Sequence, residues 1–264
     1  MTGQRGIVVR AGRRLAQGAG LVLLAAGVLL AANELVPTDD PLGPAPVRVR
    51  VLAPGTFQST HAYAPYYVVP AKRIADPSKL SRADTNRFVT SPETALSEGA
   101  LAGSPQIVRL ELRATTDRRI TVGGVRIHVV SSARPLVGWF TAQPACEFKR
   151  VRLARVNVDR RPPTVRYLDP RGARRDGLGL ELDRHAPAVL ELQVATKRRR
   201  VAWTATLSVT RAGAPPQTVT VDDGGKPFRV TSVRRSRGYT ARFGATGVSG
   251  FARKRSWDRG VTGC

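Results

Sequence analysis

The sequence predicts a mainly β protein: an antiparallel β-sandwich of eight or nine strands with one short helix, preceded by a single transmembrane helix. Two patterns indicate the sandwich. From Gln106 onward, apolar and polar residues alternate along short segments, as half-buried strands require. Glycine and proline clusters separate these segments, and about eight strands at such spacing are typical of a sandwich. An immunoglobulin-like architecture is compatible with this pattern.

The N-terminal region predicts a membrane anchor. Residues 15–33 carry no charge, and as a helix of about 1.5 Å per residue they would cover roughly 28 Å, close to the roughly 30 Å hydrocarbon core. Four arginines precede this segment and acidic residues follow it, a bias that places the N-terminus in the cytoplasm. We therefore expect a cytoplasmic basic N-terminus at 1–14, a transmembrane signal-anchor at 15–36 and an extracytoplasmic main domain. A cleaved signal peptide is the alternative.

Proline and charge set the other domain boundaries. Residues 37–55 contain five prolines and no hydrophobic period, which predicts an extended linker. The sandwich is then expected at 56–243 and a flexible basic tail at 244–264. Inside the domain, an aromatic stretch with several prolines predicts an edge strand and loops. The one helix is expected near Ser91-Pro92-Glu93, because proline fits the first helical position.

The alternating segments locate the strands. In 106–113, valine and leucine alternate with arginine and glutamate, which predicts one buried and one solvent-exposed face. The other strands predicted in this way are at 125–130, 151–159, 178–183, 188–194, 201–209, 217–223 and 227–233.

The segment 221–230, VDDGGKPFRV, places two carboxylates beside two glycines. The glycines can supply the positive φ of a tight hairpin between two strands. Asp222 and Asp223 are adjacent, so in a strand their side chains would point to opposite faces and could not bind one ion together. The sequence therefore favours a turn here over a metal or catalytic site.

The sequence shows no catalytic motif, and we expect no enzyme activity, bound metal or cofactor. Three isolated histidines have no zinc-ligand spacing, and neither a GxSxG nor a nucleotide-binding glycine motif is present. Glu181 and Asp183 share one strand face, but that face is the exposed one and arginines are near, which favours an ion-paired surface. The alternative is an extracytoplasmic hydrolase whose carboxylate pair is assembled only by the fold.

Charge is the most unusual property of the chain. It has 43 Lys and Arg against 19 Asp and Glu, a net charge of +24, and only six of the cations are lysines. Such a surface attracts polyanions. Basic clusters occur at 197–200, 234–237 and 253–255. The last two are interleaved with aromatic residues that could stack on bases or sugars: Tyr239, Phe243, Phe251 and Trp257. The predicted polyanion contacts are Arg234, Arg235, Arg237, Arg253, Lys254, Arg255 and Trp257. A solvated turn and a disordered tail are the alternative.

The chain has two cysteines, Cys146 and Cys264. In an oxidising compartment they could form a disulfide if the end of the chain folds back. Two free thiols are the alternative.

Several segments together resemble a known group of proteins. The order YYVVPAKRIADP, a helical stretch, IVRLELRATTDRRITVGGVRIHVVSSARP, a Cys-containing loop, VAWTATLSV and VDDGGKPFRVTS is similar to that of uncharacterised actinobacterial membrane-anchored proteins with an extracytoplasmic domain of unknown function. The resemblance covers residues 57–235. Such relatives tend to have further cysteines just before the Trp-containing strand, where residues 196–202 of this chain have none. The resemblance supports the architecture and leaves the function open.

Together these observations predict a membrane-anchored extracytoplasmic binding or structural domain. Its strongly basic surface would contact an anionic cell-wall polymer, lipid headgroups or a partner protein. If the topology is inverted, the domain faces the cytoplasm and nucleic acid becomes the expected partner.

Overall fold

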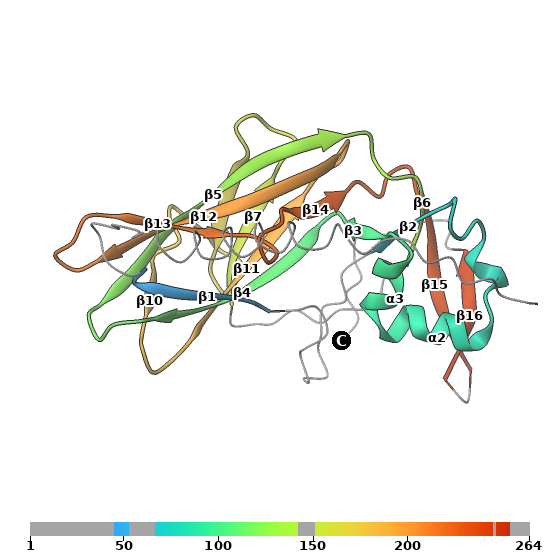
Figure 1. The fold of residues 1–264 in the computed structure, drawn as a ribbon, viewed down its shortest axis with the longest axis horizontal. Helices are drawn as coiled ribbons and strands as arrows, with labels where there is room; N and C mark the ends of the chain where they lie inside the picture. Colours follow the sequence, from blue (N-terminus) through green and yellow to red (C-terminus); the bar gives the residue numbers. More distant parts are fainter. Residues whose placement is uncertain (1–44, 53–66, 142–150, 245–246, 254–264) are drawn as a thin grey trace, which may run out of the picture. The chain divides into compact units, whose positions relative to one another are not determined.

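Strands dominate the computed structural model, which describes residues 45–52, 67–141, 151–244 and 247–253 (Figure 1). All four ranges belong to one compact unit, residues 45–264. None of their helices is long and apolar enough to cross a lipid bilayer. The predicted cytoplasmic N-terminus and anchor, residues 1–36, lie outside the described residues.

The first sheet has six strands in the order β1-β4-β11-β7-β8-β9. Its strands are β1 (Val47–Leu52), β4 (Gln106–Ala114), β7 (Arg152–Asn157), β8 (Thr164–Leu168), β9 (Arg174–Arg175) and β11 (Ala188–Ala195). The strand β1 lies within the predicted linker at 37–55, but Val47 is buried and Val49 and Val51 pack against the core. These residues therefore belong to the sheet and not to a linker.

The second sheet has ten strands in the order β10-β5-β12-β14-β3-β2-β6-β15-β16, with β13 also paired to β12. Its strands are β2 (Tyr67–Pro70), β3 (Leu101–Gly103), β5 (Ile120–Ala133), β6 (Gly138–Thr141), β10 (Leu180–Leu182), β12 (Arg200–Arg211), β13 (Gln217–Val221), β14 (Phe228–Thr231), β15 (Arg237–Gly244) and β16 (Gly247–Arg253). The prediction of a mainly β protein is confirmed. The purely antiparallel arrangement is wrong, because β7 with β11, β3 with β14 and β6 with β15 pair in parallel.

Two α-helices, where one was predicted, and a 3-10 turn occur within the described residues: η1 (Pro77–Lys79), α2 (Arg82–Thr90) and α3 (Pro92–Ser97). The hydroxyl of Ser81 accepts a hydrogen bond from the backbone N–H of Asp84 and caps α2. The helix α3 begins at the predicted proline, with Ser91 as its N-cap. The turn η1 and the helix α2 pack against β16 (Figure 1).

The main hydrophobic core contains residues of both sheets. At its centre the fully buried Trp203 of β12 packs on Phe228, with 4.6 Å between the ring centroids. The indole Nε1 of Trp203 donates a hydrogen bond of 2.9 Å to the side-chain oxygen of Gln106 in β4. The polar edge of this indole therefore has a partner, and the bond joins the two sheets.

A second, smaller core surrounds Trp139 of β6. Its ring contacts Phe88, Tyr239 and Phe251, with centroid distances of 5.5, 6.0 and 5.3 Å. Tyr239 and Phe251 are therefore core residues, and the prediction that they stack on a ligand is wrong. Phe243, which belongs to the same set of aromatic residues, is 69% exposed. The tail predicted at 244–264 is likewise wrong for residues 247–253, which form β16; residues 254–264 lie outside the described part.

The segment 221–230 forms a tight turn but not the predicted hairpin. Gly224 and Gly225 have φ of 61° and 81°, and Asp223 and Lys226 exchange backbone hydrogen bonds of 2.7 and 3.3 Å across them. The strands on either side, β13 and β14, do not pair with each other. Both pair antiparallel with β12, β13 at residues 205–209 and β14 at 200–203. The turn therefore connects two strands that both pair with β12 and not with each other.

The polar face predicted for β4 is only partly exposed. Arg109 is 4% exposed and forms a 2.8 Å ion pair with the equally buried Glu191 of β11. The two residues are direct cross-strand neighbours in the sheet. Alternation thus places both side chains on the correct face but does not reveal that this part of the face is buried.

Candidate anion-binding site

Two basic clusters of the sequence, 197–200 and 234–237, come together in space. The first spans the turn from β11 into β12, and the second follows β14. They meet because β12 begins where β14 ends, with Arg200 opposite Thr231. The buried Ser232 fixes the contact: its backbone N–H donates to the carbonyl oxygen of Arg199 at 3.0 Å, and its hydroxyl donates to that of Lys197 at 2.8 Å.

The carboxylate of Asp159 holds the turn between β11 and β12, residues 196–199. One oxygen accepts a hydrogen bond of 2.8 Å from the hydroxyl of the buried Thr196, and the other accepts 2.6 Å from the backbone N–H of Lys197. The backbone N–H of Thr196 donates to the hydroxyl of Ser104 at 2.9 Å. The backbone of the turn is therefore fixed by side chains from two other loops, so the turn itself needs little reordering to bind a ligand.

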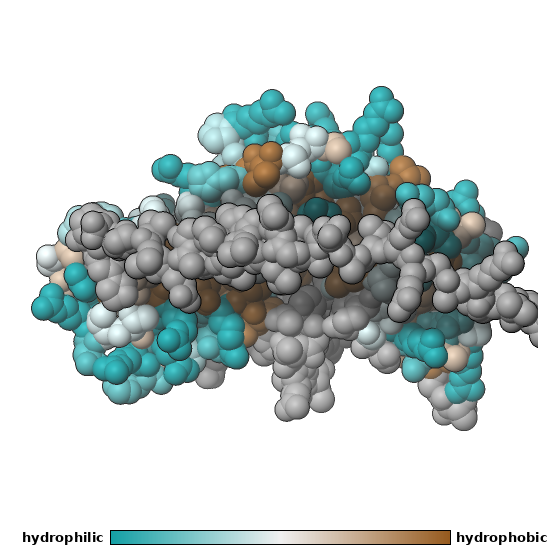
Figure 2. Space-filling view, in the orientation of Figure 1, coloured by the Kyte–Doolittle hydropathy of each residue, from teal (hydrophilic) through white to brown (hydrophobic). Residues whose placement is uncertain are grey.

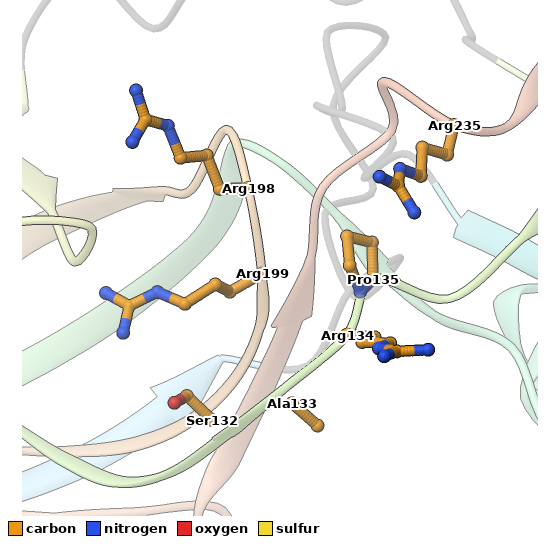
Figure 3. A pocket seen from close by; sticks show the side chains of 7 residues that line it. All are labelled: Ser132, Ala133, Arg134, Pro135, Arg198, Arg199 and Arg235. Atoms are coloured by element: carbon orange, nitrogen blue, oxygen red, sulfur yellow. The ribbon is translucent and has the colours of Figure 1, made fainter.

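A surface hollow of about 530 Å³ lies beside this turn. It is lined by Ser132, Ala133, Arg134, Pro135, Arg198, Arg199 and Arg235, and we call it the arginine hollow (Figure 3). Arg134 joins the two clusters because β5 ends where β12 begins, with Ala133 opposite Arg200. The described lining therefore contains four arginines from three segments and no acidic side chain.

The arginines of the hollow point in different directions. Figure 3 shows the guanidinium groups of Arg198 and Arg199 extending to one side and those of Arg134 and Arg235 lying on the other. They do not converge on one point, as a compact pocket for a single small anion would require. The arrangement instead presents separate contacts along a surface, which suits a ligand that carries several anionic groups.

Arg199 differs from the other three arginines. Its guanidinium donates to the carbonyl oxygen of Val158 at 2.6 Å and lies 3.6 Å from the carboxylate of Asp159. Its side chain is only 23% exposed. Arg134, Arg198 and Arg235 are exposed and take part in no ion pair among the described residues. These three are therefore the cations that face a ligand.

The predicted polyanion contacts have different outcomes. Arg235 lines the hollow, and Arg234 follows the Ser232 junction and is exposed. Arg253 is exposed at the end of β16. Lys254, Arg255 and Trp257 lie outside the described residues, as do Cys146 and Cys264. Sequence reasoning missed Arg134, an isolated arginine at a strand end, and did not connect 197–200 with 234–237.

Arg237 already has an acidic neighbour. The pKa of Asp76 is lowered from its ordinary value, chiefly by the hydrogen bond from the hydroxyl of Ser78 and then by the bond from the backbone N–H of Ser78. The nearby charges of Lys79 and Arg237 lower this pKa further. Arg237 therefore interacts electrostatically with Asp76, although the ion pairs of the described residues do not include these two.

Glu181 and Asp183, the two carboxylates that share a strand face, are both exposed. Glu181 is exposed and lies 3.8 Å from Arg119, while Asp183 accepts a hydrogen bond of 2.8 Å from the backbone N–H of His185. The flanking leucines 180 and 182 are buried, which agrees with the predicted ion-paired surface. Within the described ranges, no three His, Cys, Asp or Glu side chains are grouped so that they could hold a metal ion.

Comparisons with protein-family models, with curated proteins and with solved structures each find no match for this chain. The hollow and its surroundings therefore have to be interpreted from the chain's own residues.

Proposed function

We propose that this protein is a β-sandwich binding domain that holds a linear anionic polymer at its arginine hollow, and that residues 15–36 anchor it to the membrane with the domain outside. The ligand class is a polymer with closely spaced phosphate or carboxylate groups. One observation carries the binding proposal: arginines from three segments line one hollow whose described lining has no acidic side chain. The planar guanidinium group can donate two parallel hydrogen bonds to a carboxylate or to a phosphate group.

The lining also favours a ligand without bases. Proteins that bind single-stranded nucleic acid stack its bases on aromatic side chains. No aromatic residue is found in the described lining of the arginine hollow, and Tyr239 and Phe251 are buried in the second core. On the face that Figure 2 shows, hydrophilic side chains project from the periphery of the described residues, while hydrophobic ones show mainly between them. Charge, rather than stacking, is the means of recognition that this surface offers.

The triple variant R134Q/R198Q/R235Q tests the hollow. We expect its affinity for long-chain inorganic polyphosphate, measured by calorimetry, to fall about ten- to a hundredfold, since each of the three exposed charge contacts contributes about 0.5–1 kcal/mol. The slope of log affinity against log salt should decrease by about three, one for each lost contact. The matched control R126Q/R174Q/R175Q removes the same charge from exposed positions outside the hollow. Equal losses of affinity in both triple variants would mean that only the net charge of the protein matters, and would contradict the proposal.

Membrane topology is tested by cysteine labelling. In a background without Cys146 and Cys264, Thr218→Cys places a thiol at an exposed position of β13. We expect a membrane-impermeant thiol reagent to label it on intact cells, because the domain lies outside. The matched variant Gly3→Cys, before the anchor, should be labelled only after lysis. The reverse pattern would invert the topology and make nucleic acid the partner to test.

A further inference from the structure

A second basic hollow, of about 390 Å³, is also lined by a residue of the turn at 196–199. Its lining includes the cations Arg155, Arg160, Arg166 and Lys197 and the polar side chains of Asn157 and Gln193. No acidic side chain is present in its described lining. We call it the β7–β8 hollow, because most of its cations belong to these strands and the loop between them.

Like charges face each other in this hollow. Arg155 of β7 and Arg166 of β8 are direct cross-strand neighbours, and both are exposed. Equal charges directly opposite each other destabilise a strand pair. The Nε–H of Arg155 donates to the side-chain oxygen of Gln193 at 3.2 Å, which positions the guanidinium group but does not neutralise it. A bound anion would relieve this repulsion.

Glu191, which Gln193 also contacts, forms no ion pair with Arg155. The amide of Gln193 donates to one oxygen of Glu191 at 2.8 Å, but the other oxygen of this carboxylate forms the buried ion pair with Arg109. The ion pairs of the described residues include neither Arg155 nor Arg166. The two arginines thus keep their charges available for an external ligand.

The turn at 196–199 connects the two hollows. Lys197 lines the β7–β8 hollow, and the next residue, Arg198, lines the arginine hollow; their Cα atoms are about 3.8 Å apart. The carboxylate of Asp159 and the hydroxyl of Ser232 hold this turn from both sides. The same short, hydrogen-bonded turn therefore carries at least one cation of each hollow.

We propose that one linear polyanion occupies both hollows and crosses the turn at 196–199. This inference rests on the proposed function and adds that the ligand is bound at two sites at once. Once one part of the chain is bound, the other hollow meets the rest of the same chain at a high effective concentration. Affinity therefore rises with chain length once the chain spans both hollows. A short anion, which reaches only one hollow, lacks this advantage.

Chain length and a second triple variant test the inference. We expect the wild-type chain to bind long-chain polyphosphate at least about a hundredfold more tightly than tripolyphosphate, at equal phosphate concentration. R155Q/R160Q/R166Q should remove most of this ratio and reduce the salt slope by about three. Polygalacturonate of similar length distinguishes carboxylate from phosphate as the preferred anion, and binding to either supports a two-site ligand. Thermal unfolding of each variant confirms that it folds.

The outcomes separate the two proposals. If R134Q/R198Q/R235Q weakens long-chain binding while R155Q/R160Q/R166Q leaves affinity and salt slope unchanged, the two-site inference is overturned and the arginine hollow stands. If neither variant weakens binding, both proposals are overturned. Tighter binding of a single-stranded oligonucleotide than of polyphosphate with as many phosphates would overturn the base-free ligand class.

Discussion

Gly138→Ala is expected to lower the free energy of unfolding by about 3 kcal/mol or more, a large effect for one added methyl group. A Cβ atom at this position would lie 1.8 Å from the carbonyl oxygen of Val69 and 3.1 Å from the backbone nitrogen of Ala71. Both obstacles are backbone atoms of β2 and the residue after it, so no side-chain rotation can relieve the clash. The paired strands β2 and β6 would have to separate.

The same separation would disturb the second core. Trp139 follows Gly138 in β6, and its ring holds Phe88 of α2, Tyr239 of β15 and Phe251 of β16. We therefore expect Gly138→Ala to change tryptophan fluorescence as well as stability, both measured during denaturant unfolding. Gly123→Ala is the matched control, because a Cβ there meets nothing within 4 Å. Stability within about 0.5 kcal/mol of wild type for Gly138→Ala would contradict the close approach of these strands.

Alternation predicts the strands that have one buried and one polar face. The eight segments selected in this way correspond to β4, β5, β7, β10, β11, β12, β13 and β14. In β12 all the inward residues are fully buried: Val201, Trp203, Ala205, Leu207 and Val209. The residues that alternate with them are more exposed. A regular period of two is a strong signal because the strand geometry itself imposes it.

Strands without a clean period were missed. In β16 the buried Val248 and Phe251 are three residues apart, because the pairing with β15 shifts register between Arg242 and Phe243. Such an irregularity breaks the alternation. The sequence also has cations on both sides of these residues, which suggested a solvated tail. Their burial depends on Trp139, about 100 residues earlier in the chain, and local sequence does not reveal that contact.

The candidate site was only partly predictable for a related reason. Each basic cluster is visible in the sequence, and Arg235 was selected from its cluster. The meeting of 197–200 with 234–237 depends on the register of β12 and β14 and on the bonds made by Ser232. Arg134 enters the hollow through the register of β5. Strand registers over such separations are long-range properties, so no short motif contains them.

Glu191→Ala is expected to lower the free energy of unfolding by about 3–5 kcal/mol. Its carboxylate lies 2.8 Å from Nε of Arg109, and both side chains are 4% exposed. Removing one partner of a buried ion pair leaves the other charge buried without that compensation, and this penalty exceeds what the pair contributed by forming. Urea unfolding monitored by circular dichroism measures the loss.

The double variant R109M/E191L separates charge from packing. It removes both charges and keeps apolar volume at both positions, so its stability should return to within about 1–2 kcal/mol of wild type. The change in the free energy of unfolding of the double variant, minus the sum of the changes of R109M and E191L, gives the coupling energy of the pair.

An exposed ion pair of similar length provides the control. Arg184 and Asp117 lie 2.9 Å apart, but their side chains are 54% and 72% exposed, and Asp117→Ala should change stability by less than about 1 kcal/mol. If Glu191→Ala changed stability as little as Asp117→Ala does, the Arg109–Glu191 pair would have to be accessible to water in solution. In that case the pair would contribute as little to stability as an exposed one.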